Sequence, residues 1–120
     1  MDAFTTIKGV ATSLGYACTP NHYTGKESRY VEYNYAVLSG RNFGDDRPLC
    51  NVADVQVHLY MPLKENFLTR MKQMQEALFE AGFTWPEVTV LSEYDEVETS
   101  KGLDGIRHIV FECEYEEELD

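Results

Sequence analysis

Hydrophobic residues recur at helical spacing in two segments of the chain, residues 2–14 and 64–81. In the first segment Asp2 can cap the amino-terminal end, and the apolar side chains share one face. In the second segment the apolar positions follow the i, i+4, i+7 spacing of an amphipathic helix. Gly15 and Gly82 follow the two segments at the position where helices commonly end. The pattern predicts two helices that each bury one face.

Apolar and polar residues alternate with period two in residues 29–38 and 53–60. This alternation, rich in β-branched and aromatic residues, predicts two strands with one buried face. Between them, residues 39–49 carry two Gly, two Asp, one Asn and one Pro, which predicts a turn-rich loop longer than a tight hairpin needs. Two strands joined in this way most simply form an antiparallel pair.

Two further strands are predicted at residues 87–94 and 105–115. A short edge strand or an irregular arm is expected within residues 16–28, with the strand near residues 17–23. The acidic residues 116–120 are expected to form a frayed, solvated tail. The element order is α-β-β-α-β-β, with the edge strand as an addition. This order predicts an α+β fold, a two-layer sandwich in which two helices pack on one face of an antiparallel β-sheet.

The length of 120 residues fits a single α+β domain over residues 1–120. The chain has 21 acidic and 10 basic residues, which gives a net charge of -11. Because nucleic-acid affinity comes mainly from Lys and Arg on phosphates, this balance argues against a surface that grips DNA or RNA, and it equally disfavours anionic lipid. The first residues contain no apolar run, so no signal peptide is expected. Three Cys without a CxxC motif predict free thiols in a reducing compartment.

The residues that could carry chemistry are few and scattered. His58 and His108 fall on the more polar faces of predicted strands and could be neighbours across the sheet, but exposed strand residues are the commoner explanation. Asp45 and Asp46 lie on a Gly-containing loop and could hold a divalent cation, although they lack the ligand spacing of a calcium loop. Met71, at helical spacing beside other apolar residues, is assigned to the core. We expect no catalytic residues, no cofactor and no metal.

Two features fit an interaction surface better than a simple half-buried sheet. Tyrosines occupy both faces of the predicted strands, and Tyr is enriched in the cores of protein interfaces. The sequence RNFGDDR in the predicted loop carries two arginines beside two acids, and it could dock on the charges of a neighbouring subunit as readily as form a solvated hairpin tip. The candidates for contacts between subunits are Tyr30, Arg41, Phe43, Asp45, Asp46, Arg47 and Tyr60.

Three motifs occur in order along the chain. Tyr30 and Tyr33 lie on a predicted strand, an Asp pair follows in the next loop, and the run VHLY at residues 57–60 precedes a helix that ends before FTW. This order resembles that of small tail-terminator (tail-completion) proteins of siphophages and Gram-positive prophages, which share the patterns P-Y-x-x-Y and x-V-x-L-Y. The strand IRHIVFECEY is similar to the closing strand of that family. The resemblance covers roughly residues 1–115, and Arg29 stands where the family has proline.

The resemblance implies a structural role without catalysis. Tail terminators form a ring, often of six copies, that caps the finished tail tube and presents the surface on which the head joins. The implied partners are further copies of the chain, the major tail tube protein and a head–tail connector or neck protein. DNA passes through the bore without specific binding, and no membrane takes part. The implied location is the tail of the virion, after assembly in the host cytoplasm.

The acidity of the chain fits such a ring, because a negative lining of the bore repels phosphate and keeps DNA from sticking. The acidic candidates for the bore or the ring surface are Glu93, Asp95, Glu96, Glu98 and the Glu-rich carboxyl terminus. Other assignments stay open at this point. They are another head–tail neck or minor capsid component, a small α+β ligand-binding or regulatory domain, and an enzyme with a divalent ion at Asp45 and Asp46.

Overall fold

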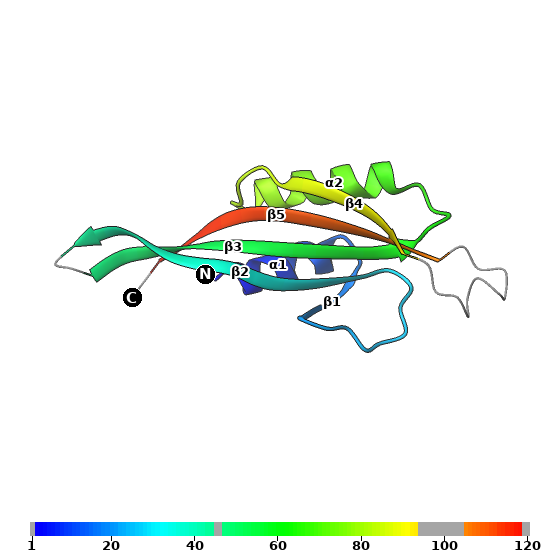
Figure 1. Cartoon of the computed structure of the whole chain (residues 1–120), viewed down its shortest axis with the longest axis horizontal. Coiled ribbons are helices and arrows are strands. Elements are labelled where there is room, and N and C mark those ends of the chain that lie inside the picture. Colours follow the sequence, from blue (N-terminus) through cyan, green and yellow to red (C-terminus); the bar gives the residue numbers. More distant parts are fainter. Residues whose placement is uncertain (1, 45–46, 94–104, 119–120) are drawn as a thin grey trace.

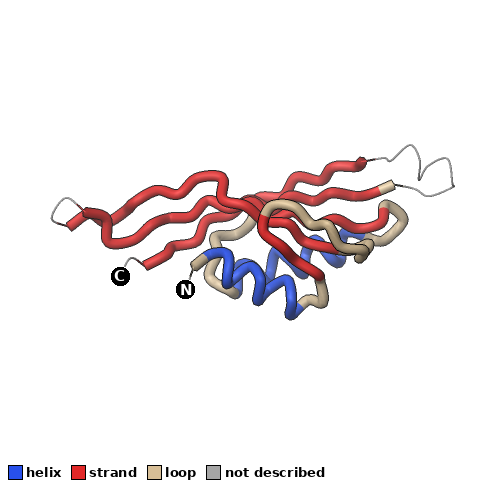
Figure 2. Tube along the Cα trace, turned by 90° about the horizontal axis from the view of Figure 1, so that it is seen from below, coloured by secondary structure: helices blue, strands red, loops and turns tan. Residues whose placement is uncertain are grey.

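The computed structural model describes residues 2–44, 47–93 and 105–118 (Figure 1). In chain order its elements are α1 (Ala3–Ser13), β1 (Ala17–Pro20), β2 (Tyr30–Gly44), β3 (Arg47–Pro62), α2 (Phe67–Glu80), β4 (Glu87–Glu93) and β5 (Ile106–Glu118). The described strands form a five-stranded sheet in the order β1-β2-β3-β5-β4, in which β1 runs parallel to β2 and all other neighbours are antiparallel. Both helices lie on the same face of the sheet (Figure 2). The predicted α+β class and element order are confirmed, with β1 as an added strand at the sheet edge.

The hydrophobic core fills the space between the two helices and the sheet face that they cover. Ile7 of α1 and Met74 and Leu78 of α2 are fully buried there. The sheet contributes the fully buried side chains Val31, Val55, Val57, Leu59, Ile109 and Phe111. These positions alternate along each strand, so the intervening residues point to the other side. We call that other side, which no helix covers in the described part of the chain, the open face.

Each helix begins at a side-chain cap and ends before a glycine. Asp2 accepts a hydrogen bond of 2.7 Å from a backbone N–H in the first turn of α1, and this bond lowers the pKa of its carboxyl group. Asn66 caps α2 in the same way, so α2 begins three residues later than predicted. Gly15 and Gly82 have φ values of 87° and 109°, in the left-handed region that glycine adopts without strain. No helix in the described residues is long and apolar enough to cross a membrane.

Residues 39–44 and 47–49 are strand rather than part of the predicted loop, and residues 45–46 lie outside the described part. β2 and β3 stay paired from Tyr30–Tyr60 to Gly44–Arg47, with one register shift between Tyr35 and Val37. The prediction failed because the turn preference of Gly, Asn and Asp determines the local structure only where the backbone has no partner strand. Here the cross-strand ladder satisfies the backbone N–H and C=O groups that the two strands turn towards each other.

β5 also runs further than predicted, to Glu118. Its last residues pair with β3, Glu116 opposite Val52 and Glu118 opposite Cys50. The expected frayed tail is therefore wrong for residues 116–118, and residues 119–120 lie outside the described part. Successive side chains point to opposite faces of a strand, so the run of glutamates spreads its charge over both faces and the ladder continues.

Candidate interaction surface

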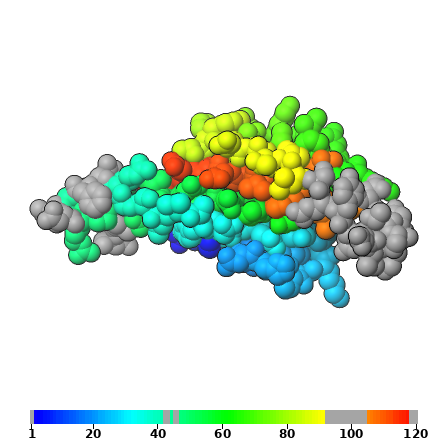
Figure 3. All heavy atoms as spheres, in the orientation of Figure 1, coloured from blue at the N-terminus to red at the C-terminus, as the bar shows by residue number. Residues whose placement is uncertain are grey.

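A long hairpin projects from the body of the molecule. We call its part beyond the register shift, residues 37–44 and 47–54, the arm (Figure 3). The projection gives the molecule principal extents of 61 × 24 × 21 Å. Val37, Leu38 and Leu49 on the arm are 52%, 50% and 61% exposed. An exposed strand pair with apolar side chains is a surface that proteins normally cover.

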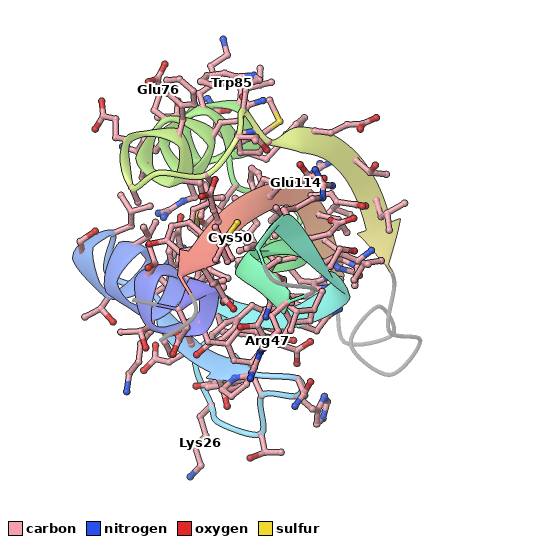
Figure 4. All side chains as sticks on the ribbon, turned by 90° about the vertical axis from the view of Figure 1, so that its left-hand side faces the viewer. Lys26, Arg47, Cys50, Glu76, Trp85 and Glu114 are labelled. Atoms are coloured by element: carbon pink, nitrogen blue, oxygen red, sulfur yellow. The ribbon has the colours of Figure 1, made fainter. Side chains whose placement is uncertain are left out.

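The structure places the predicted contact residues at two separate locations. Arg41 and Arg47 are exposed on the arm, and Figure 4 looks at the molecule from the arm's end with Arg47 labelled. Phe43 lies on β2, and its backbone pairs with Pro48. Asp45 and Asp46 lie outside the described residues. Tyr30 and Tyr60 are not on the arm, so the structure does not join them to the arginines in one surface.

Tyr30 and Tyr60 belong instead to a row of rings on the open face. The ring centroids of Tyr23 and Tyr30 lie 4.5 Å apart, those of Tyr30 and Tyr60 4.8 Å, and those of Tyr60 and His108 4.3 Å. Tyr23 lies in the connection between β1 and β2. The carboxylate of Glu32 on β2 accepts a hydrogen bond of 2.7 Å from the Tyr23 backbone N–H and holds this connection against the sheet. Tyr30 and Tyr60 are thus half-buried by contacts within the chain. Their role between subunits stays a prediction.

The two histidines meet across the sheet, as the sequence suggested. His58 Nδ1 lies 2.8 Å from His108 Nε2, and His58 Nε2 lies 2.9 Å from Asn34 Oδ1. Because an amide oxygen only accepts, His58 Nε2 carries the proton, and His58 Nδ1 accepts from His108. Burial, and then the nearby His108, lower the pKa of His58, which favours the neutral form of the His58 ring near pH 7. Among the described residues, no group of three His, Cys, Asp or Glu side chains could hold a metal ion.

Carboxylates gather on the open face next to these rings. Glu112 lies between Gln56 of β3 and Glu87 of β4, and Asp54 lies opposite Glu114 in the adjoining row. The negative charge of Asp54 is the main cause that raises the pKa of Glu112, followed by burial and a hydrogen bond between the two carboxyl groups. The sequence did not predict these carboxylates as a group, because they lie on three strands, β3, β4 and β5, that only the sheet register brings together.

The acidic candidates from the sequence fall largely elsewhere. Glu93 is the last residue of β4, and its side chain is outside the described part. Asp95, Glu96 and Glu98 lie outside the described residues altogether. The acidic surface that the structure does describe is therefore the open face, not the segment after β4.

Replacing Glu112 by Gln is expected to raise the melting temperature at pH 7. A carboxyl whose pKa is raised on folding stabilises the fold below its unfolded pKa, and that contribution is lost as the pH rises through the folded value. Gln removes the charge that faces Asp54, so the gain is expected at pH 7 and is expected to vanish near pH 4. Thermal melts at both pH values test this, with Glu76→Gln on the exposed side of α2 as the control. Equal melting temperatures of wild type and Glu112→Gln at pH 7 would contradict it.

The helix side of the molecule offers two wide, shallow hollows along α2. One is lined by Glu65, Asn66, Thr69, Arg70 and Gln73, and the other reaches from Thr69 past Lys72 to Leu14 and Glu80. Both are open to solvent and are lined mainly by one helix, whereas small-molecule sites are concave and bury most of their ligand. These two hollows thus give little support to a ligand-binding function.

Comparisons with known proteins add no assignment. No family model matches the chain, and no curated protein matches it.

Proposed function

We propose that this chain is a structural subunit of a phage tail that assembles with further copies into a ring, caps the tail tube and forms the surface to which the head joins. The arm is the observation that carries the proposal. Its side chains Val37, Leu38 and Leu49 are half or more exposed, although the strands that bear them are regular and paired. A hairpin that projects beyond the helices does not bury these residues against its own core, which supports their being covered by a second molecule.

The order of motifs in the sequence supports the tail-terminator assignment in particular. The chain combines an acidic open face with a net charge of -11, which suits a ring through which DNA moves without binding. Under this proposal the further partners are the major tail tube protein and a head–tail connector or neck protein.

Native mass spectrometry over a range of protein concentrations tests the proposal, followed by negative-stain imaging of the largest species. We expect closed rings, formed either by the protein alone or on addition of the tail tube protein. The double variant Val37→Ser/Leu38→Ser is expected to shift the population to monomer, whereas Phe79→Ser, which removes an equally exposed apolar side chain from α2, is expected to leave it unchanged. A twofold dimer, or a monomer under all these conditions, would contradict the proposal.

A further inference from the structure

Two edges of the sheet have no neighbouring strand in the described part of the chain: the outer side of β2 beyond Tyr33 and the outer side of β4. β1 pairs only with residues Tyr30–Tyr33 of β2, so the rest of β2 has no strand on its outer side within the described part of the chain. β4 is the outermost strand at the other end of the sheet order. One molecule thus carries two different free edges, and an unpaired edge is a template for a strand from another chain.

We propose that β4 of a second copy adds to residues 34–41 of β2 as an antiparallel strand, with Glu87 opposite Arg41 and Leu91 opposite Val37. This inference rests on the proposed self-assembly and names the surfaces that make it.

Strand direction is the first argument. β2 and β3, β3 and β5, and β5 and β4 are each antiparallel, so β4 runs opposite to β2 within one molecule. If a second copy continues the sheet in the same orientation, its β4 therefore lies antiparallel to β2 of the first. Antiparallel pairing requires no crossover and is the more stable of the two ladders.

The space along β2 fixes the register. β1 ends where Pro20 pairs with Tyr33, and the seven residues of β4 fit directly beyond it. Because Ala36 is the extra residue at the register shift, Glu93 at the end of β4 comes opposite Asn34. A shift of two residues towards β1 would bring β4 against Tyr33, which is already paired. A shift of one residue would turn every side chain of β4 to the wrong face.

The same register matches apolar side chains on both faces. Val37 comes opposite Leu91, and both belong to the open face, since they pair with Asp54 and His108 within the chain. Leu38 comes opposite Val90 on the helix-covered face, next to Ala53 and Ile109 in their own sheets. All four side chains are 40% exposed or more, so the pairing covers four of the nine large exposed apolar side chains among the described residues.

Charge supports the same pairing. Arg41 and Glu87 are both exposed, and both lie on the open face at the end of the proposed ladder. An opposite-charge pair directly across two strands is favourable.

The two edges differ from each other, so the contact is heterologous. Each molecule uses its arm on one neighbour and its β4 on the next. A heterologous contact produces a closed ring when the rotation between neighbours closes, and a filament when it does not. The arm is thereby assigned as the element that joins one subunit to the next.

Disulfide cross-linking between two variants tests the register. Val37→Cys and Leu91→Cys proteins are mixed and oxidised, because residues directly opposite in an antiparallel ladder have Cα atoms within the range of a disulfide. The control mixes Val37→Cys with Thr89→Cys, which is on the same face but two residues out of register; native Cys18, Cys50 and Cys113 contribute equally to both mixtures. A covalent dimer in the first mixture and not in the control is expected. Rings without this selective cross-link would contradict the edge pairing but not the proposed ring assembly. No association at all would contradict both proposals.

Charge reversal gives an independent readout. Arg41→Glu and Glu87→Arg are each expected to weaken self-association by about five-fold. The double variant is expected to recover most of the loss, because the pair is restored with opposite sense. Arg47→Glu, on the arm but outside the proposed ladder, is the matched control. A double variant that associates no better than either single one would overturn the pairing of these two residues.

Discussion

Replacing Phe111 by Ala is expected to lower the free energy of unfolding by about 3–5 kcal/mol. Phe111 is the largest fully buried side chain, and it lies on β5 between Val57 of β3 and Val88 of β4. Its removal loses apolar burial and leaves a cavity that the sheet cannot close, since strands on both sides hold the backbone in place. Denaturant unfolding measures the effect as a lower midpoint with an unchanged slope.

The control for this variant is Phe79→Ala. Phe79 is 51% exposed on α2, so the same change of side chain is expected to cost about 1 kcal/mol or less. Similar losses for the two variants would contradict the core that we describe between the sheet and the helices.

Replacing Glu117 by Ala is expected to lower the free energy of unfolding by about 1–3 kcal/mol. The Glu117 carboxylate accepts the backbone N–H of Ala3 at 2.7 Å, and it also accepts the Tyr35 hydroxyl at 2.7 Å. One acidic side chain thus satisfies the first turn of α1, where negative charge is favourable, and ties that helix to β2. Burial and the hydrogen bond to Glu117 raise the pKa of Tyr35, so its hydroxyl stays a donor throughout the physiological range.

Hydrogen exchange of α1 provides the second readout. Glu117→Ala is expected to speed exchange in the first turns of α1, while Glu116→Ala, an exposed neighbour on β5, is expected to leave it unchanged. If both variants exchange alike, the carboxylate of Glu117 does not hold the helix.

The helices and most strand positions could be predicted because local patterns dominate there. A capping side chain at Asp2, glycines after both helices and strict alternation in the middle of β3 each point to one structure. The arm could not be predicted in this way. Between Ser39 and Leu49 the local residues favour a turn, and only the pairing of β2 with β3 makes residues 39–44 and 47–49 strand.

The open face shows the same limit for the candidate site. The stack of Tyr23, Tyr30, Tyr60 and His108 depends on the cross-strand register and on a connection that folds back over the sheet. A sequence read by itself shows an excess of tyrosine but not that its members contact each other. Only the strand register shows whether these tyrosines stack on one another or lie apart on the surface.

The order in which the strands join has a consequence for biosynthesis. β3 pairs with β5 from Pro62–Ile106 to Cys50–Glu118, so the centre of the sheet closes only after the chain has been made as far as Glu118. The β2–β3 hairpin is complete once Tyr60 has been made, 58 residues before Glu118, and until β5 is made the other side of β3 has no partner strand. Non-local pairing of this kind is slow, and bare edges invite wrong partners. A ribosome-bound chain therefore exposes the arm, the surface that we propose contacts a second copy, before β5 has completed the sheet. Under that proposal, assembly with other copies follows the synthesis of the last strand.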